Sequence, residues 1–323
     1  MNKVVILCPA NSVTGGPELL HQFAYELSNN NIEASILYYP YGDYEVPSEY
    51  SKYNVDVCDF DAVKDIDCVL VFPEVATNLA YDFQSKNKYI WWLSVDNHFK
   101  AYPRSTFGKF KFKIKSILNK KSVPIPMSKM KDYKHLSQSE YGLQFLDDNN
   151  VKHAFKLTDY LNEVHLNNRV NIKEKENIVA YNPKKGVVFT KALIESNPSI
   201  NFVPIQDMTA IQVGELLNRS KVYIDFGEHP GKDRIPREAA MAKCVVITGM
   251  RGSASNSIDL PIDNKYKFEE TESSIKEIGA LINDVFVDFD SNVSEFKHYI
   301  GIIQSEKAAF IQQTKDFIKL IKQ

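Results

Sequence analysis

The chain has 323 residues, of which 44% are hydrophobic and 25% are charged. This length suggests about two domains, and the composition excludes a chain that is disordered over most of its length. The formal net charge of −2 excludes a general attraction to nucleic acid, so any basic surface must be local.

The first half of the chain alternates short apolar runs with longer amphipathic stretches, a pattern typical of parallel α/β domains. Residues 4–7 predict a buried strand, and residues 18–28 predict the helix that follows it, with apolar side chains on one face. Later segments repeat this order, with strands predicted at 34–39, 68–72 and 89–95 and a helix at 137–146.

A second α/β set follows a charged stretch at 167–177, which we interpret as a linker. The last residues, 295–323, place apolar side chains at helical spacing and predict a packing helix. We therefore predict an N-terminal domain over 1–168 and a C-terminal domain over 169–323. Strands of the second set are predicted at 178–181, 201–204, 222–226 and 245–248, and helices ending near 195, over 211–218 and from about 236.

The four cysteines show no metal-ligand spacing, and three of them, Cys8, Cys68 and Cys244, lie in or beside apolar runs, whereas Cys58 does not. Buried free thiols suit the reducing cytosol. The apolar run near the N-terminus is too short for a signal peptide, and no run approaches the ~20 residues that a membrane-spanning helix needs. We therefore expect a cytoplasmic protein.

Charged residues are unusually dense in the loop and helix start that follow the predicted strand at 222–226. Three cations beside the amides of a helix start would suit a diphosphate, and a carboxylate would suit a ribose diol. A solvated helix start with surface ion pairs is the alternative. The charged side chains are Glu228, His229, Lys232, Asp233, Arg234, Arg237 and Glu238.

This region resembles the donor-site motif of retaining glycosyltransferases of family 4, which have the GT-B fold. In that motif a second glutamate is followed by Ala-Met-Ala, a strand and a glycine turn, which Glu238, Ala239–Ala242, Val245–Ile247 and Gly252 match. The resemblance implies that Glu238 binds the ribose of a nucleotide sugar. It also implies two Rossmann-like domains that face each other across a cleft, with a C-terminal helix packing back toward the first domain.

Two residues of the family pattern are absent here. The first glutamate, which contacts the donor sugar, would fall on Pro230, and Glu228 and Asp233 are the alternatives for that contact. Lys185 matches the lysine that binds the donor phosphate, but the arginine normally five residues earlier would be Ala180. The candidates for the missing positive charge are Lys184, Lys232 and Arg234.

Residues from both halves complete the predicted donor site. Gly15 and Gly16 match the family's N-terminal glycine loop, although a plain tight turn explains them equally well. The spacing of a dinucleotide fingerprint and a Walker-type motif are both absent. The residues predicted to bind the nucleotide sugar are Gly15, Gly16, Lys184, Lys185, His229, Gly231, Lys232, Asp233, Arg234, Arg237, Glu238, Gly252 and Ser253.

A further polar cluster follows the last predicted strand of the first domain. The segment Trp91–His98 resembles one that recurs in a subgroup of bacterial surface-polysaccharide enzymes, and the family often has a histidine in this loop. We expect Asp96, Asn97 and His98 to face the cleft, and a surface histidine is the alternative. These three residues and Glu228 form the predicted catalytic set.

Residues Arg104 to Lys121 form a local basic segment in which lysines alternate with apolar residues. Such a segment is attracted to anionic lipid by ~1 kcal/mol per basic residue. An edge strand guarded by lysines is the alternative. Because no RNA or DNA motif accompanies the segment, we favour lipid or a lipid-linked acceptor over nucleic acid. The alternating lysines are Lys109, Lys111, Lys113 and Lys115.

These features predict a glycosyltransferase that moves a sugar from a nucleotide sugar, most commonly a UDP-sugar, to a glycan or lipid-linked acceptor. The resemblance implies retention at the anomeric carbon without a bound metal or another cofactor. The basic segment predicts peripheral attachment at the inner face of the membrane. A nucleotide-sugar epimerase and a non-catalytic GT-B-like binding subunit are the alternatives.

Overall fold

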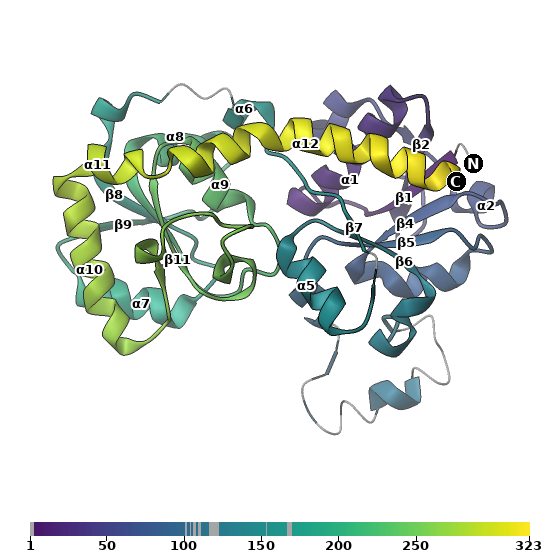
Figure 1. Cartoon of the computed structure of the whole chain (residues 1–323), viewed down its shortest axis with the longest axis horizontal. Coiled ribbons are helices and arrows are strands. Elements are labelled where there is room, and N and C mark those ends of the chain that lie inside the picture. The colour runs from purple at the N-terminus through teal and green to yellow at the C-terminus, as the bar shows by residue number, and fades with distance from the viewer. Residues whose placement is uncertain are drawn as a thin grey trace. The chain divides into compact units, whose positions relative to one another are not determined.

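The computed structural model describes residues 3–100, 102–103, 105, 108, 111–115, 123–152, 154–166 and 170–323. The chain forms two compact units (Figure 1). The first unit consists of Met1–Asp159 and Ala308–Gln323, and the second of Tyr160–Lys307. Among the residues that the structure describes, no helix combines the length and hydrophobicity needed to cross a membrane.

The first unit contains a seven-stranded sheet in which neighbouring strands run parallel. The inner strand β1 is buried from Val4 to Cys8, as expected for a parallel strand covered on both faces. The strand order reverses between β1 and β4, so the loops after these two strands diverge. The order is β3 (Asp56–Val57), β2 (Glu33–Tyr39), β1 (Lys3–Pro9), β4 (Val69–Pro73), β5 (Lys88–Trp92), β6 (Lys134–Ser137) and β7 (Phe155–Lys156).

Helices and 3-10 turns connect these strands. Ser139 caps α5 by accepting a hydrogen bond from the Gly142 backbone nitrogen at 3.0 Å, as serine favours at this position. Among the described residues the helices include α1 (Gly15–Asn29), α2 (Phe60–Val63), α3 (Val95–Lys100) and α5 (Glu140–Asp148), and the 3-10 turns include η1 (Ser48–Tyr53), η2 (Glu74–Asp82) and η4 (Met127–Asp132).

The second unit contains a five-stranded parallel sheet with the order β12 (Lys267–Phe268), β11 (Val245–Gly249), β10 (Ser220–Asp225), β8 (Glu176–Tyr181) and β9 (Asn201–Pro204). Figure 1 shows α7 and α10 on one side of this sheet and α8 and α9 on the other. The helices are α6 (Glu163–Leu166), α7 (Val187–Ser196), α8 (Ala210–Arg219), α9 (Arg234–Met241), α10 (Glu272–Val287) and α11 (Phe289–Ser294), and the 3-10 turns are η5 (Ile172–Glu174), η6 (Gly252–Ser255) and η7 (Asn264–Tyr266).

The last helix, α12 (Lys297–Lys322), begins in the second unit and ends in the first. Phe310 and Phe317 are fully buried, and their rings lie 6.3 Å and 5.3 Å from the ring of Phe23 in α1. The end of the chain is therefore anchored on the first unit by aromatic packing, as expected for the C-terminal helix.

Two predicted elements were wrong at their boundaries. The strand predicted at 89–95 ends at Trp92, and α3 begins at Val95, so the polar cluster Asp96–His98 is helical instead of a loop. The helix predicted from Ser137 begins only at Glu140, because Ser137 pairs with Trp92 as the last residue of β6. The sequence Lys134–Ser137 is too short to show strand periodicity.

The basic segment is only partly described, since Arg104, Lys109 and Phe110 lie outside the described residues. Residues 111–115 are helical, so the edge-strand alternative is wrong for this part. In a helix, alternate lysines do not share one face, because successive residues are rotated by about 100°.

Candidate functional site

Strand order in the second unit reverses between β8 and β10, and ligands bind at such switch points in parallel sheets. Two glycines with positive φ, Gly186 (51°) and Gly227 (97°), let the loops after these strands touch. A β-carbon on Gly227 would lie 2.4 Å from the Gly186 backbone nitrogen, so only glycine fits. The contact places Lys185 beside the charged loop that follows β10.

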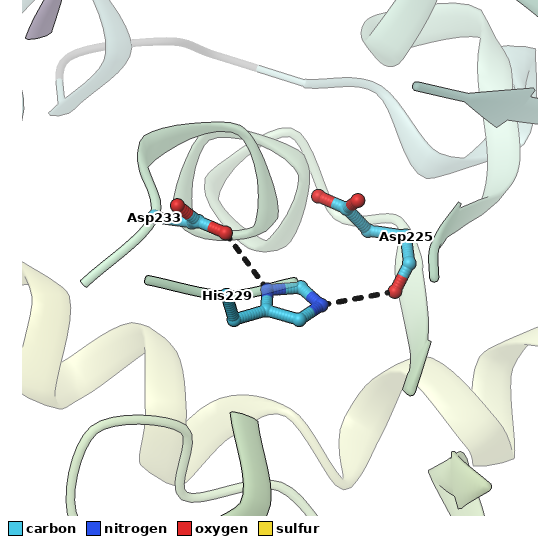
Figure 2. A group of neighbouring side chains, drawn as sticks. All are labelled: Asp225, His229 and Asp233. Atoms are coloured by element: carbon cyan, nitrogen blue, oxygen red, sulfur yellow. Dashed lines mark hydrogen bonds and ion pairs between the residues drawn. The ribbon is translucent and has the colours of Figure 1, made fainter. Parts of the chain in front are cut away.

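Lys185 joins a network with Asp225, His229 and Asp233, and Figure 2 shows the last three. Asp225 and His229 are buried, whereas Lys185 and Asp233 are partly buried. Lys185 Nζ donates to Asp233 Oδ2, and His229 Nδ1 lies 2.8 Å from the same oxygen. His229 Nε2 lies 3.2 Å from the Asp225 backbone oxygen. Asp233 precedes α9 at the capping position, but its side chain makes no capping bond because the two cations engage it.

Asp225 ends β10 and is 2% exposed. Its Oδ2 accepts a hydrogen bond from the Tyr223 hydroxyl at 2.9 Å, whereas Oδ1 is buried without a hydrogen-bond partner in the described part of the chain. Burial raises the pKa of Asp225, against the opposing charges of Lys185 and His229.

The other three members of the network favour their charged forms. Burial alone would lower the pKa of Lys185 and of His229, but the carboxylates of Asp225 and Asp233 outweigh it and raise both. Burial would raise the pKa of Asp233, but the hydrogen bond from His229 and the charge of Lys185 lower it. The network is therefore a cluster of alternating charges in a desolvated position.

The ligand atoms of Asp225, His229 and Asp233 lie within 4.8 Å of one another, a spacing that a metal ion would accept. The Lys185 ammonium already binds Asp233 Oδ2, however, and the facing His229 Nδ1 directs its hydrogen at the same oxygen. A metal would have to displace a lysine and remove a ring proton, so the arrangement fits an ammonium better than a metal.

Lys232 and Arg237, which were predicted to bind the donor, are engaged by Glu306 of α12. Arg237 is fully buried, and its Nη1 lies 2.8 Å from Glu306 Oε2. Lys232 Nζ lies 2.6 Å from Glu306 Oε1. This differs from the expected role, because both cations already pair inside the protein with one carboxylate that is 3% exposed.

Glu238 and Arg234 lie together on the first turns of α9. Glu238 Oε1 lies 3.9 Å from Arg234 Nε and 3.5 Å from His165 Nε2, and the Glu238 side chain is 12% exposed. Arg234 and His165 therefore cover most of the Glu238 carboxylate from solvent. Glu238 lies in α9, which follows the charged loop after β10.

The remaining charged candidates are exposed. Glu228 forms an ion pair with Arg251 at 3.4 Å, and Arg251 also lies 3.2 Å from Glu270 Oε2. Glu270 in turn accepts a hydrogen bond from the Gly227 backbone nitrogen at 2.7 Å, which fixes the loop after β10. Lys184 is exposed.

A turn after β11 fastens the charged loop through Gly252 and Ser253. The Ser253 backbone nitrogen donates to the His229 backbone oxygen at 2.9 Å, and Ser253 Oγ donates to the Gly231 oxygen at 2.5 Å. Gly252 has φ of 57°, and a β-carbon there would lie 2.0 Å from the His229 oxygen. Gly231, Gly252 and Ser253, which were predicted to bind the donor, therefore fix the conformation of the charged loop through contacts with its backbone.

Replacing Gly252 by alanine is expected to lower the free energy of unfolding by about 2 kcal/mol or more, because strained backbone and a backbone clash coincide. Chemical denaturation measures this change. Gly214→Ala is the matched control: nothing lies within 4 Å of a β-carbon there, and the site is inside α8, so a gain of about 0.5–1 kcal/mol is expected. Equal effects of the two substitutions would contradict the backbone argument.

The glycine loop of the first unit is less constrained. Thr14 is the N-capping residue of α1, and Gly15 and Gly16 are the first two residues of that helix. A β-carbon on Gly16 would make ordinary contact with Leu93 at 3.8 Å. Glycine is therefore not required there by packing, although the loop lies at the carboxyl end of β1 at that unit's switch point.

His98 is an interior residue of the first unit, 1% exposed, and not a surface histidine. Its Nδ1 lies 2.7 Å from the Glu74 backbone oxygen, its ring lies 5.1 Å from that of Trp92, and burial lowers its pKa. Asp96 Oδ1 accepts a hydrogen bond from Tyr141 at 3.1 Å, and Asn97 Oδ1 is buried without a hydrogen-bond partner among the described residues.

Glu74 follows β4 and fixes the turn before α3. Its side chain is buried, and its Oε2 accepts a hydrogen bond from the Leu93 backbone nitrogen at 3.0 Å. Burial raises the pKa of Glu74 to about 7, against the backbone hydrogen bonds from Leu93 and Ser94. Glu74 thus positions the segment that carries the three polar candidates.

An open pocket of about 790 Å³ lies between the starts of α7 and α10 in the second unit. Val187, Val188 and Ile275 give it apolar walls, and Arg251 and Glu270 give it a charged edge. Because Gly186 also lines it, the pocket adjoins the loop that carries Lys185. Its size is in the range of small-molecule sites.

Sequence reasoning missed Asp225 and Glu306. Asp225 had a signal, because it is the single acid at the end of the apolar run Val222–Phe226. The sequence also carried a signal for Glu306, because this residue lies between Ile303 and Phe310 on the apolar stripe of α12. A carboxylate on a buried stripe indicates a buried cation that pairs with it.

No protein-family model matches this sequence, and no curated protein matches it. Solved structures do match. HepE of Anabaena in complex with UDP is 10% identical, covers 99% of both chains and has a TM-score of 0.65. Sucrose-phosphate synthase from Thermosynechococcus elongatus is 9% identical, covers 99% of both chains and has a TM-score of 0.63.

TarM of S. aureus, in complex with fondaparinux, alpha-GlcNAc-glycerol and UDP, is 13% identical, covers 79% of this chain and 55% of its own, and has a TM-score of 0.53. At these identities the likeness concerns the fold. It confirms the expected fold class: two Rossmann-like units, each with a parallel sheet, as in GT-B glycosyltransferases.

Proposed function

We propose that this protein is a glycosyltransferase that transfers a sugar from a nucleotide sugar, with UDP as the most common carrier, to a glycan or lipid-linked acceptor. The observation that carries the proposal is the partly buried network of paired charges at the switch point of the second unit, where Lys185 precedes α7. A cation beside helix-start amides favours a diphosphate. The GT-B fold and the UDP in the HepE complex support this assignment.

In the proposed reaction the second unit binds the donor and the first unit binds the acceptor. Lys185 and the amides at the start of α7 hold the diphosphate and stabilise the charge that develops as it leaves, which is electrostatic catalysis. Glu238 binds the ribose, as the family resemblance implies. Retention at the anomeric carbon is part of the proposal and rests on that resemblance.

The function is tested by measuring release of free UDP from UDP-sugars with and without acceptor. A glycosyltransferase releases UDP faster when acceptor is present. An epimerase changes the sugar without releasing UDP, and a non-catalytic subunit binds UDP without turnover. A thermal-shift screen of nucleotides and nucleotide sugars identifies the donor first, because a ligand of the folded state raises its stability.

Glu238→Ala is expected to weaken binding of the nucleotide sugar by about tenfold to a hundredfold, because hydrogen bonds to a charged group contribute about 1.5–3 kcal/mol. Calorimetry with UDP and with the bare diphosphate measures the effect, and only UDP carries the ribose. Glu195→Ala is a control on an exposed glutamate of the same unit. Unchanged UDP affinity in Glu238→Ala would remove this residue from the site.

The basic segment Arg104 to Lys121 is proposed to bind anionic membrane or a lipid-linked acceptor at the inner face of the membrane. Its charges attract anionic lipid and its apolar residues enter the interface. Phe112 packs against Tyr102 with ring centroids 4.8 Å apart, while Ile114 is exposed.

Replacing the four alternating lysines of this segment by glutamine is expected to abolish sedimentation with anionic vesicles at low salt, while UDP binding persists. Salt near 1 M should release the wild-type protein, since the Debye length falls to about 3 Å. If the wild-type protein does not sediment with anionic vesicles at low salt, the proposal is contradicted. A matched control carries the same substitution at four lysines elsewhere, the exposed Lys152, Lys191 and Lys319 and the partly exposed Lys64.

A further inference from the structure

Four buried histidines in the described part of the chain divide into two classes by their hydrogen bonds. His135 is the clearest member of the first class: its Nδ1 accepts from Trp92 Nε1 at 3.0 Å, so that nitrogen carries no hydrogen. Its Nε2 faces the Met130 backbone oxygen at 2.8 Å and must donate. His135 is therefore neutral, with one defined ring proton.

His21 and His98 share this pattern. Each faces a backbone oxygen through Nδ1, at 2.7 Å, and a tyrosine hydroxyl through Nε2, at 2.8 Å in His21 and 3.4 Å in His98. The Tyr38 hydroxyl can donate to the second nitrogen of His21, so one ring proton satisfies that ring. Burial lowers the pKa of His21, His98 and His135, in agreement with these hydrogen bonds.

His229 is different because both of its ring nitrogens face oxygens that only accept. Nε2 faces the backbone oxygen of Asp225, and Nδ1 faces Asp233 Oδ2. A proton on Asp233 would let that oxygen donate, but Lys185 donates to the same oxygen and keeps the carboxylate ionised. Both nitrogens of His229 must then carry hydrogens, which makes the ring a cation.

We propose that His229 is held as an imidazolium cation in the donor site, where its charge keeps the network of Lys185, Asp225 and Asp233 neutral, so that the network does not repel the diphosphate. The inference deepens the proposed function and rests on it for the identity of the ligand. With His229 charged, two cations balance Asp225 and Asp233. Loss of the ring proton leaves an excess negative charge beside Lys185, which repels a diphosphate.

The groups around His229 come from every element that packs on it. Lys185 comes from the loop after β8, Asp225 from β10 and Asp233 from the start of α9. The adjoining small cavity adds Lys232, Asp259 and Tyr299 of α12, and the charge of Glu228 acts on Lys185. The hydrogen-bonded partners of the ring remain Asp225 and Asp233, and together they raise the pKa of His229 despite its burial.

Nitrogen NMR of the histidine rings tests the charge directly, without any ligand. In the wild-type protein at about neutral pH, which is above the ordinary histidine pKa of about 6.5, we expect His229 to carry hydrogens on both ring nitrogens. We expect His135 to carry a hydrogen on one. The His229→Gln variant assigns the signal. A single ring proton on His229 below about pH 6.5 would overturn the proposal.

The consequence for the donor is tested by calorimetry with UDP. His229→Gln keeps two hydrogen-bonding groups but no charge, so UDP should bind on the order of tenfold more weakly than to wild type where His229 is charged. Because the terminal phosphate of UDP itself titrates near about pH 6, the readout is the ratio of the two affinities. This ratio should shrink as pH rises through the pKa of His229. A ratio of one at all pH values overturns the role of the charge.

His298→Gln, at an exposed histidine of the same unit, is the matched control and should leave UDP affinity unchanged. Thermal unfolding of both variants verifies that they fold. If wild type binds no UDP at any pH, the proposed UDP site fails, and the ring protons measured by NMR still decide whether His229 is a cation.

Discussion

Replacing Glu306 by alanine is expected to lower the free energy of unfolding by about 3–5 kcal/mol, the largest effect that we predict for a single side chain. Arg237 is fully buried and Lys232 has an 11% exposed side chain, and both pair with Glu306. Removal of Glu306 leaves these two cations without their carboxylate in a desolvated position. Urea or guanidinium denaturation measures the change as a shift of the midpoint.

A control for this prediction lies on the same helix. Asp316 pairs with Lys319 at 2.8 Å, but the two side chains are 44% and 70% exposed. Asp316→Ala is expected to change the free energy of unfolding by at most about 0.5 kcal/mol, since exposed pairs contribute little. A Glu306→Ala effect as small as that of Asp316→Ala would show that the buried pair does not stabilise the fold.

A double variant separates pairing from packing. Arg237→Met with Glu306→Leu removes the two most buried of the three charges, keeps apolar volume and leaves Lys232 in place. We expect this variant to be more stable than Glu306→Ala, which leaves both cations. A buried cation without its partner costs more than an apolar pair of similar size. If the double variant is the less stable of the two, the hydrogen bonds from Arg237 to the Asp233 and Lys232 backbone oxygens dominate.

Replacing Lys185 by alanine is expected to weaken UDP binding by about tenfold to more than a hundredfold and to leave uridine binding nearly unchanged. Only UDP carries the diphosphate whose charge the ammonium neutralises. The lysine is suited to this role because it adjoins the Gly186–Gly227 contact at the switch point. Calorimetric titration with the two ligands gives the comparison.

Lys191→Ala provides the matched control for Lys185, because Lys191 lies on α7 with a 74% exposed side chain. It should bind UDP as the wild-type protein does. Equal losses of UDP and uridine affinity in Lys185→Ala would mean that the lysine supports the site by packing. A loss limited to UDP separates its charge from its volume.

The sequence predicted most elements of the second unit because their patterns are local. Strand β9 occupies the predicted residues 201–204, and β11 extends the prediction at 245–248 by one residue. The predictions failed where a short element carries too few residues for periodicity, as in β6 and α3. There, pairing with Trp92 and the Glu74 contacts decide the structure, and both depend on residues far apart in the chain.

The amino-acid sequence by itself determined the alternation of strands and helices, the parallel α/β class and the charge-dense loop after β10. These depend on hydrophobic periodicity and composition, which act between near neighbours. The tertiary structure alone decided which charges pair. In the folded protein Lys232 and Arg237 pair with Glu306, some 70 residues away, whereas Lys185 and His229 both contact Asp233. Partners in a desolvated interior are set by which elements pack together, and no local pattern specifies that choice.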